Sequence, residues 1–133
     1  MPKASFKVSV SKNVVRCSLN GKWNVYTARR FDIEMRAVVQ SIKTQPWGHL
    51  VLLDEWVLGT PEFEPVIFEL VSWCSRNNVK ATALVFPENA LKAFQLGKVG
   101  LRKFEDDRVM HFSDEKRAID WLASKGFEEN ANE

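Results

Sequence analysis

The sequence is poor in the residue types from which most catalytic and metal sites are built. It contains two cysteines, two histidines and six glycines among 133 residues. Cys17 and Cys74 form no CxxC pair, so we expect two buried reduced thiols, the usual state of free cysteine in a folded protein. Neither His49 nor His111 has a partner at metal-ligand spacing, and no metal site is predicted.

Motifs for nucleotide binding and hydrolysis are also missing. Only Gly97 and Gly100 lie close together, and they do not open a helix after a strand, as a phosphate-binding loop would. No GxSxG segment occurs, so a serine hydrolase has no support from the sequence. No motif therefore marks the chain as an enzyme, and no cofactor is expected.

Long apolar runs are absent as well. The first residues lead directly into an alternating segment, without the basic start and apolar stretch of a signal peptide. The longest nearly apolar stretch surrounds residues 50–53 and is far too short to span a bilayer. We therefore expect no membrane span and a cytoplasmic location, which agrees with two unpaired cysteines.

The charge of the chain is segregated along its length. Residues 1–45 carry nine Lys or Arg and two acids, whereas residues 46–75 carry five acids and no Lys or Arg. The net charge is only +2, so no nucleic-acid partner is expected. Arg29, Arg30 and Arg36 lie on the polar face of a predicted helix, which is ordinarily solvated; the alternative is a docking patch for an acidic partner.

Hydrophobic periodicity predicts five strands and four helices. The strands are expected at residues 5–10, 14–19, 49–54, 80–86 and 108–112, and the helices between residues 25 and 42, 60 and 77, 88 and 96, and 113 and 126. Asn20-Gly21 is interpreted as a turn, and Thr60 and Ser113 as helix N-caps. No element is predicted at residues 99–107.

The resulting order is β-β-α-β-α-β-α-β-α, a hairpin followed by β-α alternation. This order predicts an α/β fold with a mixed sheet of four to five strands, parallel in its later part and flanked by helices. A chain of this length is the usual size of one domain. We place that domain at residues 1–127, followed by a frayed acidic tail at 128–133.

One segment, residues 54–62, suggests a site, because it follows a predicted parallel strand and leads into a helix. Ligand sites in open α/β sheets favour that edge. Trp56 could present an amphipathic ring there, and Asp54 and Glu55 could act as acceptors or bases. With Thr60 these residues form the candidate binding loop. Ordinary turn and helix-capping chemistry is the competing and simpler interpretation.

Several local patterns together resemble a known group. The hairpin, GKW at 21–23, LLDEW at 52–56 and the helix containing Trp73 are similar to the STAS-like domains, related to bacterial anti-sigma-factor antagonists. The resemblance covers roughly residues 5–125 and implies helices stacked mainly on one side of the sheet. It also implies a regulatory serine in a loop before a helix. The matching residues 54–61 contain Thr60 but no serine, so no phosphoserine switch is expected.

Three functions fit these observations. The first is a regulatory or scaffolding domain that contacts a protein partner or a second copy of itself. The alternative is a carrier for a small apolar, lipid-like molecule, suggested by the abundance of aromatic residues, among them Trp23, Trp47, Trp56 and Trp73. An enzyme using Asp54 or Glu55 as a general base ranks last, because no second catalytic group accompanies them.

Overall fold

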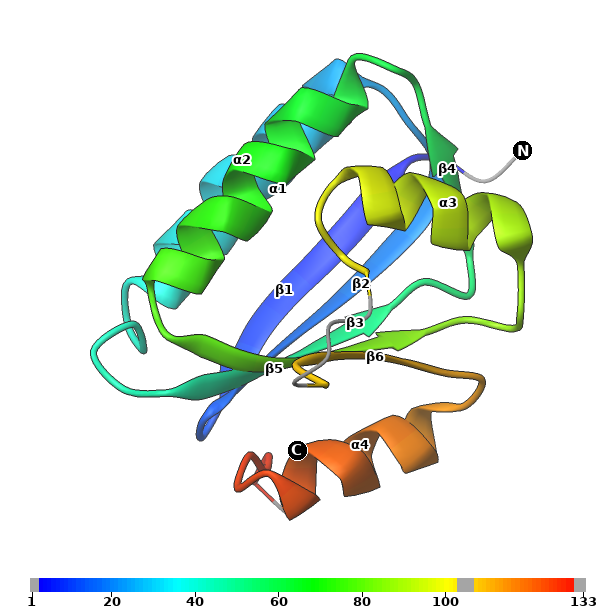
Figure 1. Cartoon of the computed structure of the whole chain (residues 1–133). Coiled ribbons are helices and arrows are strands. Elements are labelled where there is room, and N and C mark those ends of the chain that lie inside the picture. Colours follow the sequence, from blue (N-terminus) through cyan, green and yellow to red (C-terminus); the bar gives the residue numbers. More distant parts are fainter. Residues whose placement is uncertain (1–2, 103–106, 131–133) are drawn as a thin grey trace.

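The computed structural model describes residues 3–102 and 107–130 (Figure 1). Its strands are β1 (Ser5–Ser11), β2 (Val14–Trp23), β3 (Trp47–Leu52), β4 (Trp56–Gly59), β5 (Val79–Val85) and β6 (Val109–Phe112). Its helices are α1 (Val25–Val39), α2 (Phe63–Arg76), α3 (Ala90–Lys98) and α4 (Glu115–Ser124). None of the helices in these two ranges is long and apolar enough to cross a membrane.

The strands form a mixed sheet, as predicted. The order is β1-β2-β3-β5-β6, and β4 pairs with β2 outside this row. β1 and β2 are antiparallel, whereas β2–β3, β3–β5 and β5–β6 are parallel. The short strand β4, the sixth strand among the described residues, was not predicted. It runs parallel to the end of β2, so residues 56–59 of the segment predicted as a binding loop belong to the sheet and form part of its edge.

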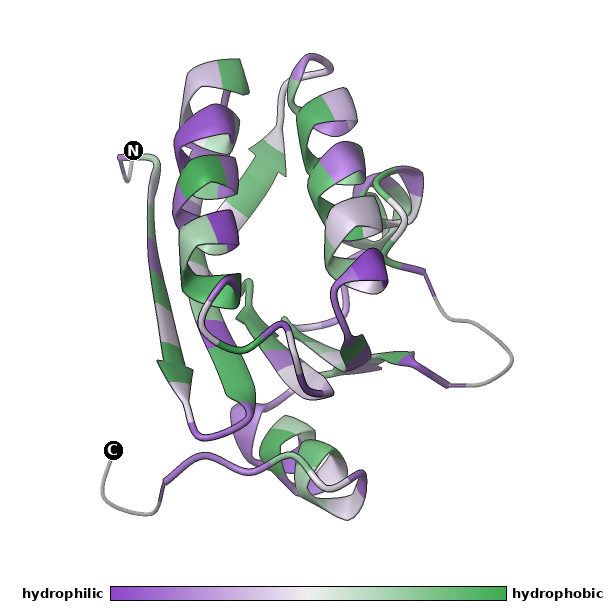
Figure 2. Cartoon of the chain, turned by 90° about the vertical axis from the view of Figure 1, so that its left-hand side faces the viewer, coloured by the Kyte–Doolittle hydropathy of each residue, from purple (hydrophilic) through white to green (hydrophobic). Residues whose placement is uncertain are grey.

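The helices lie on both faces of the sheet but mostly on one. α1, α2 and α3 cover one face, and α4 covers the other (Figures 1 and 2). Each face has its own apolar core. The larger core joins α1, α2 and α3 to the sheet, and the smaller one packs α4 through Ala118 and Leu122 against β3 and β5. The uneven distribution agrees with the expectation from the STAS-like resemblance.

The prediction of a turn at Asn20-Gly21 is wrong. β2 continues through both residues to Trp23, and the register of its pairing with β4 shifts between Gly21 and Trp23. Gly21 has φ +78°, and a Cβ there would lie 2.9 Å from backbone atoms of Ala4. Glycine is therefore required at this position by an irregularity inside a strand and by the close approach of the N-terminal segment.

Two predicted N-caps are also wrong. α2 begins at Phe63 with Glu62 at the cap position and no side-chain cap bond. Thr60 instead continues the strand edge, because its N–H donates to the Trp23 carbonyl at 2.9 Å. At α4 the capping side chain is Asp114, one residue beyond Ser113, and it accepts from the Arg117 N–H.

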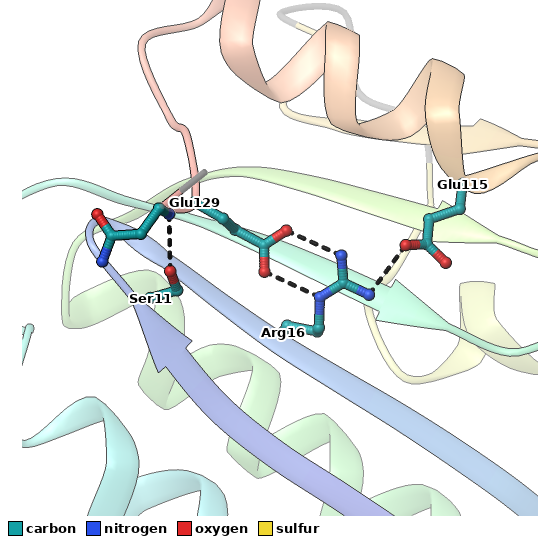
Figure 3. Close-up of polar contacts among 5 residues, drawn as sticks. Ser11, Arg16, Glu115 and Glu129 are labelled. Atoms are coloured by element: carbon teal, nitrogen blue, oxygen red, sulfur yellow. Dashed lines mark hydrogen bonds and ion pairs between the residues drawn. The ribbon is translucent and has the colours of Figure 1, made fainter. Parts of the chain in front are cut away.

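The predicted fraying of the tail does not describe residues 128–130. The Glu129 carboxylate accepts two hydrogen bonds from the Arg16 guanidinium, both at 2.8 Å, and Glu115 accepts a third at 3.0 Å (Figure 3). The Asn130 N–H donates to the Ser11 hydroxyl at 2.8 Å. The bidentate ion pair of Glu129 with Arg16 and the bond from Asn130 to Ser11 hold the segment against the β1–β2 hairpin. Residues 131–133 lie outside the described part of the chain.

Candidate functional site

A cavity of about 330 Å³ lies between the sheet and helices α2 and α3. β2, β3 and β5 form its floor, and α2 forms a wall. The residues of α2 that line it recur at helical spacing and form one face of this helix, which is apolar except at Ser75. They are Phe63, Ile67, Leu70, Val71, Cys74 and Ser75. This size and mostly apolar lining are typical of small-molecule sites.

Two polar side chains meet on the floor of the cavity. Cys17 on β2 and His49 on β3 lie with Sγ 3.3 Å from Nε2. A Cys–His pair can be a nucleophilic centre only if the thiol is ionised. Burial raises the pKa of Cys17 and lowers the pKa of His49 to about 4, so both groups are neutral at pH 7. This pair is therefore not an activated nucleophile.

Trp56 differs from the other fully buried tryptophans. Trp23 donates its indole N–H to the Asn20 carbonyl at 2.9 Å, and Trp47 donates to the Asn77 carbonyl at 2.7 Å. Trp56 is equally buried and lines the cavity, but its Nε1 has no hydrogen-bond partner among the described residues. Buried indole N–H groups usually find a partner. Trp56 is thus the polar group of this region that the fold leaves unsatisfied.

The structure separates the four residues of the candidate binding loop. Asp54 and Glu55 are exposed, and their side chains make no hydrogen bond or ion pair with the described residues. Thr60 is half-buried beside β2. Only Trp56 reaches the cavity. Asp54, Glu55 and Trp56 do border a second, shallower hollow of about 300 Å³ against α3. Asn89, Leu91 and Lys92 contribute to the lining of this hollow from the side of α3.

Helix α3 is fastened to this loop by two side chains that the sequence did not single out. The Lys92 ammonium donates to the carbonyls of Leu53 and Asp54 at 2.9 and 3.3 Å. The buried Gln95 amide accepts from the Gly59 N–H at 2.7 Å and donates to the Gly59 carbonyl at 2.8 Å. These four bonds end on backbone atoms, which leave no pattern in the sequence. The position of Lys92 and Gln95 on a short amphipathic helix was therefore the one signal that could have pointed to them.

The same corner of the molecule exposes apolar side chains. Leu91 and Phe94 of α3 are 66% and 65% exposed, and Val57 of β4 is 47% exposed. Val57 and Leu91 border the shallow hollow together, and Phe94 follows Leu91 by one helical turn. We call these three residues the β4–α3 face. Leu58, which follows Val57 in β4, has a φ angle of +74°. This left-handed conformation costs about 1–2 kcal/mol in a residue other than glycine.

The predicted arginine patch is divided in the structure. Arg29 and Arg30 are exposed on α1. Arg36 is half-buried: its Nε donates to Asp32 at 2.9 Å, and its guanidinium lies 5.0 Å from the centre of the Trp73 ring on α2. Arg36 therefore contributes to the packing of α1 against α2. The docking role of Arg29 and Arg30 stays a prediction.

Comparisons with known proteins support the fold. No family model and no curated protein matches the chain. A solved structure of an uncharacterised protein of the DUF3478 family from Shewanella loihica, described as having a SpoIIAA-like fold, superposes with a TM-score of 0.70 at 13% identity, covering 92% of this chain and 97% of that one.

Two anti-sigma-factor antagonists also match. The protein from Mycobacterium paratuberculosis gives a TM-score of 0.61 at 16% identity, covering 91% of this chain and 95% of its own. SpoIIAA in its unphosphorylated form gives 0.59 at 12% identity, covering 90% and 98%. Sequence identities this low establish the architecture alone. The predicted STAS-like α/β architecture is therefore confirmed, and the chain has the fold of the SpoIIAA-like proteins.

Proposed function

We propose that this protein is a non-catalytic regulatory or scaffolding domain that binds another protein through the β4–α3 face. The observation that carries the proposal is the exposure of Val57 and Leu91 at the border of one hollow, with exposed Phe94 one helical turn beyond Leu91. Contiguous exposed apolar side chains mark interaction sites more often than isolated ones do. Gln95 bonds α3 to β4, and Lys92 bonds α3 to the residues just before β4, so the face is organised before a partner arrives.

The chemistry of the surroundings describes the partner. Asp54 and Glu55 are exposed beside Val57 and border the same hollow. Opposite these two carboxylates a complementary partner would present Lys or Arg beside an apolar patch. Opposite the Lys98 ammonium, which lies 4.8 Å from the centre of the Phe94 ring, it would present an acidic group, because matching potentials favour encounter and register. The fold supports the proposal, since two structures with the same architecture are anti-sigma-factor antagonists. The two buried free cysteines are consistent with a cytoplasmic location.

The absence of a phosphoserine switch is part of the proposal. Residues 54–61 contain no serine. The only hydroxyl there, that of Thr60, is half-buried on a residue whose backbone N–H is bonded to β2. Thr60→Val should therefore leave partner binding within about twofold of the unsubstituted protein, because a change of less than 0.5 kcal/mol is typical of a surface position outside an interface.

The experiment replaces the apolar side chains of the face and compares partner capture. Leu91→Gln with Phe94→Gln removes two exposed apolar groups, and glutamine keeps good helix propensity. The matched control is Tyr26→Gln with Ile33→Gln on α1, whose side chains are 70% and 69% exposed. Proteins cross-linked to each variant are identified by mass spectrometry, and self-association is measured by sedimentation.

A partner, or a second copy, that is lost with the α3 pair and retained with the α1 pair supports the proposal. Capture that survives the α3 substitutions refutes it. A protein that sediments as a monomer and cross-links to no partner also refutes it.

A further inference from the structure

One edge of the sheet is long and open. β1 is the first strand in the order β1-β2-β3-β5-β6, and no strand in the described part of the chain pairs with its outer side (Figure 2). It has seven residues, whereas β6 at the other end of the row has four. Proteins usually protect such an edge with proline, a bulge or several charges. β1 has no proline, pairs with β2 without a shift of register, and carries one charge, Lys7.

The hairpin determines which backbone groups of β1 face outward. Its loop is only two residues long, so the flanking Ser11 and Val14 form a hydrogen-bonded pair. Hydrogen-bonded pairs alternate with non-bonded ones along an antiparallel ladder. The residues of β1 whose N–H and C=O groups point away from β2 are therefore Phe6, Val8 and Val10. Among the described residues, no hydrogen bond from outside the hairpin reaches these groups.

The side chains of the same three residues form an apolar row. The Phe6 ring lies 5.4 Å from the Phe31 ring of α1, and Val8 is half-buried against the same core. Val10 completes the row and is 39% exposed. The edge of β1 thus combines unpaired backbone groups with partly covered apolar side chains. An added strand can use both, because main-chain bonds give affinity and alternate side chains give specificity.

The sequence of β1 is complementary to itself in the antiparallel orientation. If two copies pair about a twofold axis at Val8, then Phe6 of each copy lies opposite Val10 of the other, and Val8 lies opposite Val8. Pairs of aromatic and β-branched residues stabilise neighbouring strands. On the other face Lys7 lies opposite Ser9, so no like charges are directly opposed. An axis at Lys7 would instead oppose two ammonium groups.

We propose that two copies of this chain associate through β1 and form one continuous antiparallel junction between their sheets. The three outward-facing residues of each strand pair with those of the other, and each pair exchanges two hydrogen bonds. The twofold arrangement uses the same surface on both copies, so association through β1 stops at the dimer. Because one strand from each copy makes the contact, we expect a buried area below about 1,200 Å² and a dissociation constant in the micromolar range.

The first test measures sedimentation and backbone amide exchange of the full chain over a concentration series. In dilute protein the amides of Phe6, Val8 and Val10 should exchange freely, whereas those of Lys7 and Ser9 are protected by β2. When about nine-tenths of the chain is dimeric, exchange of the first three amides should slow roughly tenfold. The amides of Lys7 and Ser9 are the internal control and should change little.

The second test blocks the edge. Val8→Pro removes an outward N–H that takes no part in the hairpin, and edge strands tolerate proline at such positions. The matched control is Val8→Thr, which keeps the N–H and the branched shape. We expect dimerisation to weaken more than about tenfold in Val8→Pro, because each copy loses a hydrogen bond, and less than about fivefold in Val8→Thr. Melting curves establish that both variants fold.

The third test examines the register and does not depend on the folding of Val8→Pro. Ser9→Glu places a carboxylate opposite Lys7 of the other copy, whereas Ser9→Lys places an ammonium there. At low salt the first should strengthen dimerisation and the second weaken it, each by about twofold to thirtyfold, because the pair occurs twice in the dimer. The difference should disappear in a Lys7→Gln background. This background separates the effect of Lys7 from that of Arg16, which neighbours Ser9 within the hairpin.

The inference does not depend on the β4–α3 face, which takes no part in this pairing. Leu91→Gln with Phe94→Gln should leave the β1 dimer intact, and Val8→Pro should leave capture of another protein at the β4–α3 face intact. A second copy that is bound through β1 is recognised by its loss in Val8→Pro. The failure of one proposal is therefore distinguishable from the failure of the other.

Four results would overturn the inference. The first is a chain that stays monomeric at every concentration, including one that captures a strand of a different protein at β1. The second is a dimer that keeps its affinity in a folded Val8→Pro variant. The third is an equal effect of Ser9→Glu and Ser9→Lys. The fourth is loss of the dimer in the Leu91 and Phe94 variant.

Discussion

The side chain of Gln95 provides the sharpest test of how the candidate region is held together. Gln95 is only 8% exposed. Its amide makes three hydrogen bonds: two with the Gly59 backbone, at 2.7 and 2.8 Å, and one to the Glu64 carboxylate at 3.1 Å. Gln95→Leu keeps a similar volume and removes all three. Each buried group left without its partner costs about 1–3 kcal/mol.

The expected loss is about 2–3 kcal/mol of the free energy of unfolding, because Gly59 and Glu64 are half-buried and water recovers part of the deficit. Urea unfolding followed by tryptophan fluorescence measures this value, and hydrogen exchange should show faster opening of α3 and β4 than of β3. The control is Gln45→Leu at an exposed position, which should stay within about 0.5 kcal/mol. A loss below 0.5 kcal/mol for Gln95→Leu would refute the reasoning.

Three further predictions concern the core and the tail. Trp47→Phe should destabilise the protein by about 1 kcal/mol more than Trp56→Phe in urea unfolding, because only the Trp47 indole has a partner to lose; equal losses would contradict this. Glu129→Gln should cost about 1 kcal/mol at low salt and less at high salt, since its bidentate bond is partly exposed; a salt-independent loss would contradict the electrostatic origin. Burial raises the pKa of Cys74 to about 12 and also raises that of Cys17, so neither thiol should react with iodoacetamide at pH 7.5 until the chain is unfolded. Rapid alkylation of the native protein would contradict this burial.

Periodic elements were predictable because their signal is carried by many residues. The apolar positions of α1 and α2 recur along one helical face, and the runs in β3 and β5 are apolar on both sides. Burial in the tertiary structure reinforces each of these patterns. The mixed sheet followed from the order of the elements, because a hairpin and right-handed β-α connections leave few topologies open.

The elements that were missed depend on single contacts between distant segments. β4 is four residues long, and its pairing with β2 requires the irregularity at Gly21, which reads as a turn in isolation. Thr60-Pro61-Glu62 has the composition of a helix start. However, the hydrogen bond from the Thr60 N–H to the Trp23 carbonyl places Thr60 at the edge of the sheet. Long-range pairing here outweighs local preference.

The sequence by itself determined the class of fold and the absence of a catalytic motif, and it predicted a site in the segment after β3. Periodicity and residue type carry this information locally. Only the tertiary structure decided that Trp56 faces a cavity while Asp54 and Glu55 face solvent. It also decided that Gln95 fastens α3 to β4 and that Lys92 fastens α3 to the residues just before β4. The contacts of Gln95 and Lys92 are made with backbone atoms of residues more than thirty positions away, and the cavity is enclosed by segments that are far apart in the sequence. No local pattern of side chains can predict such contacts.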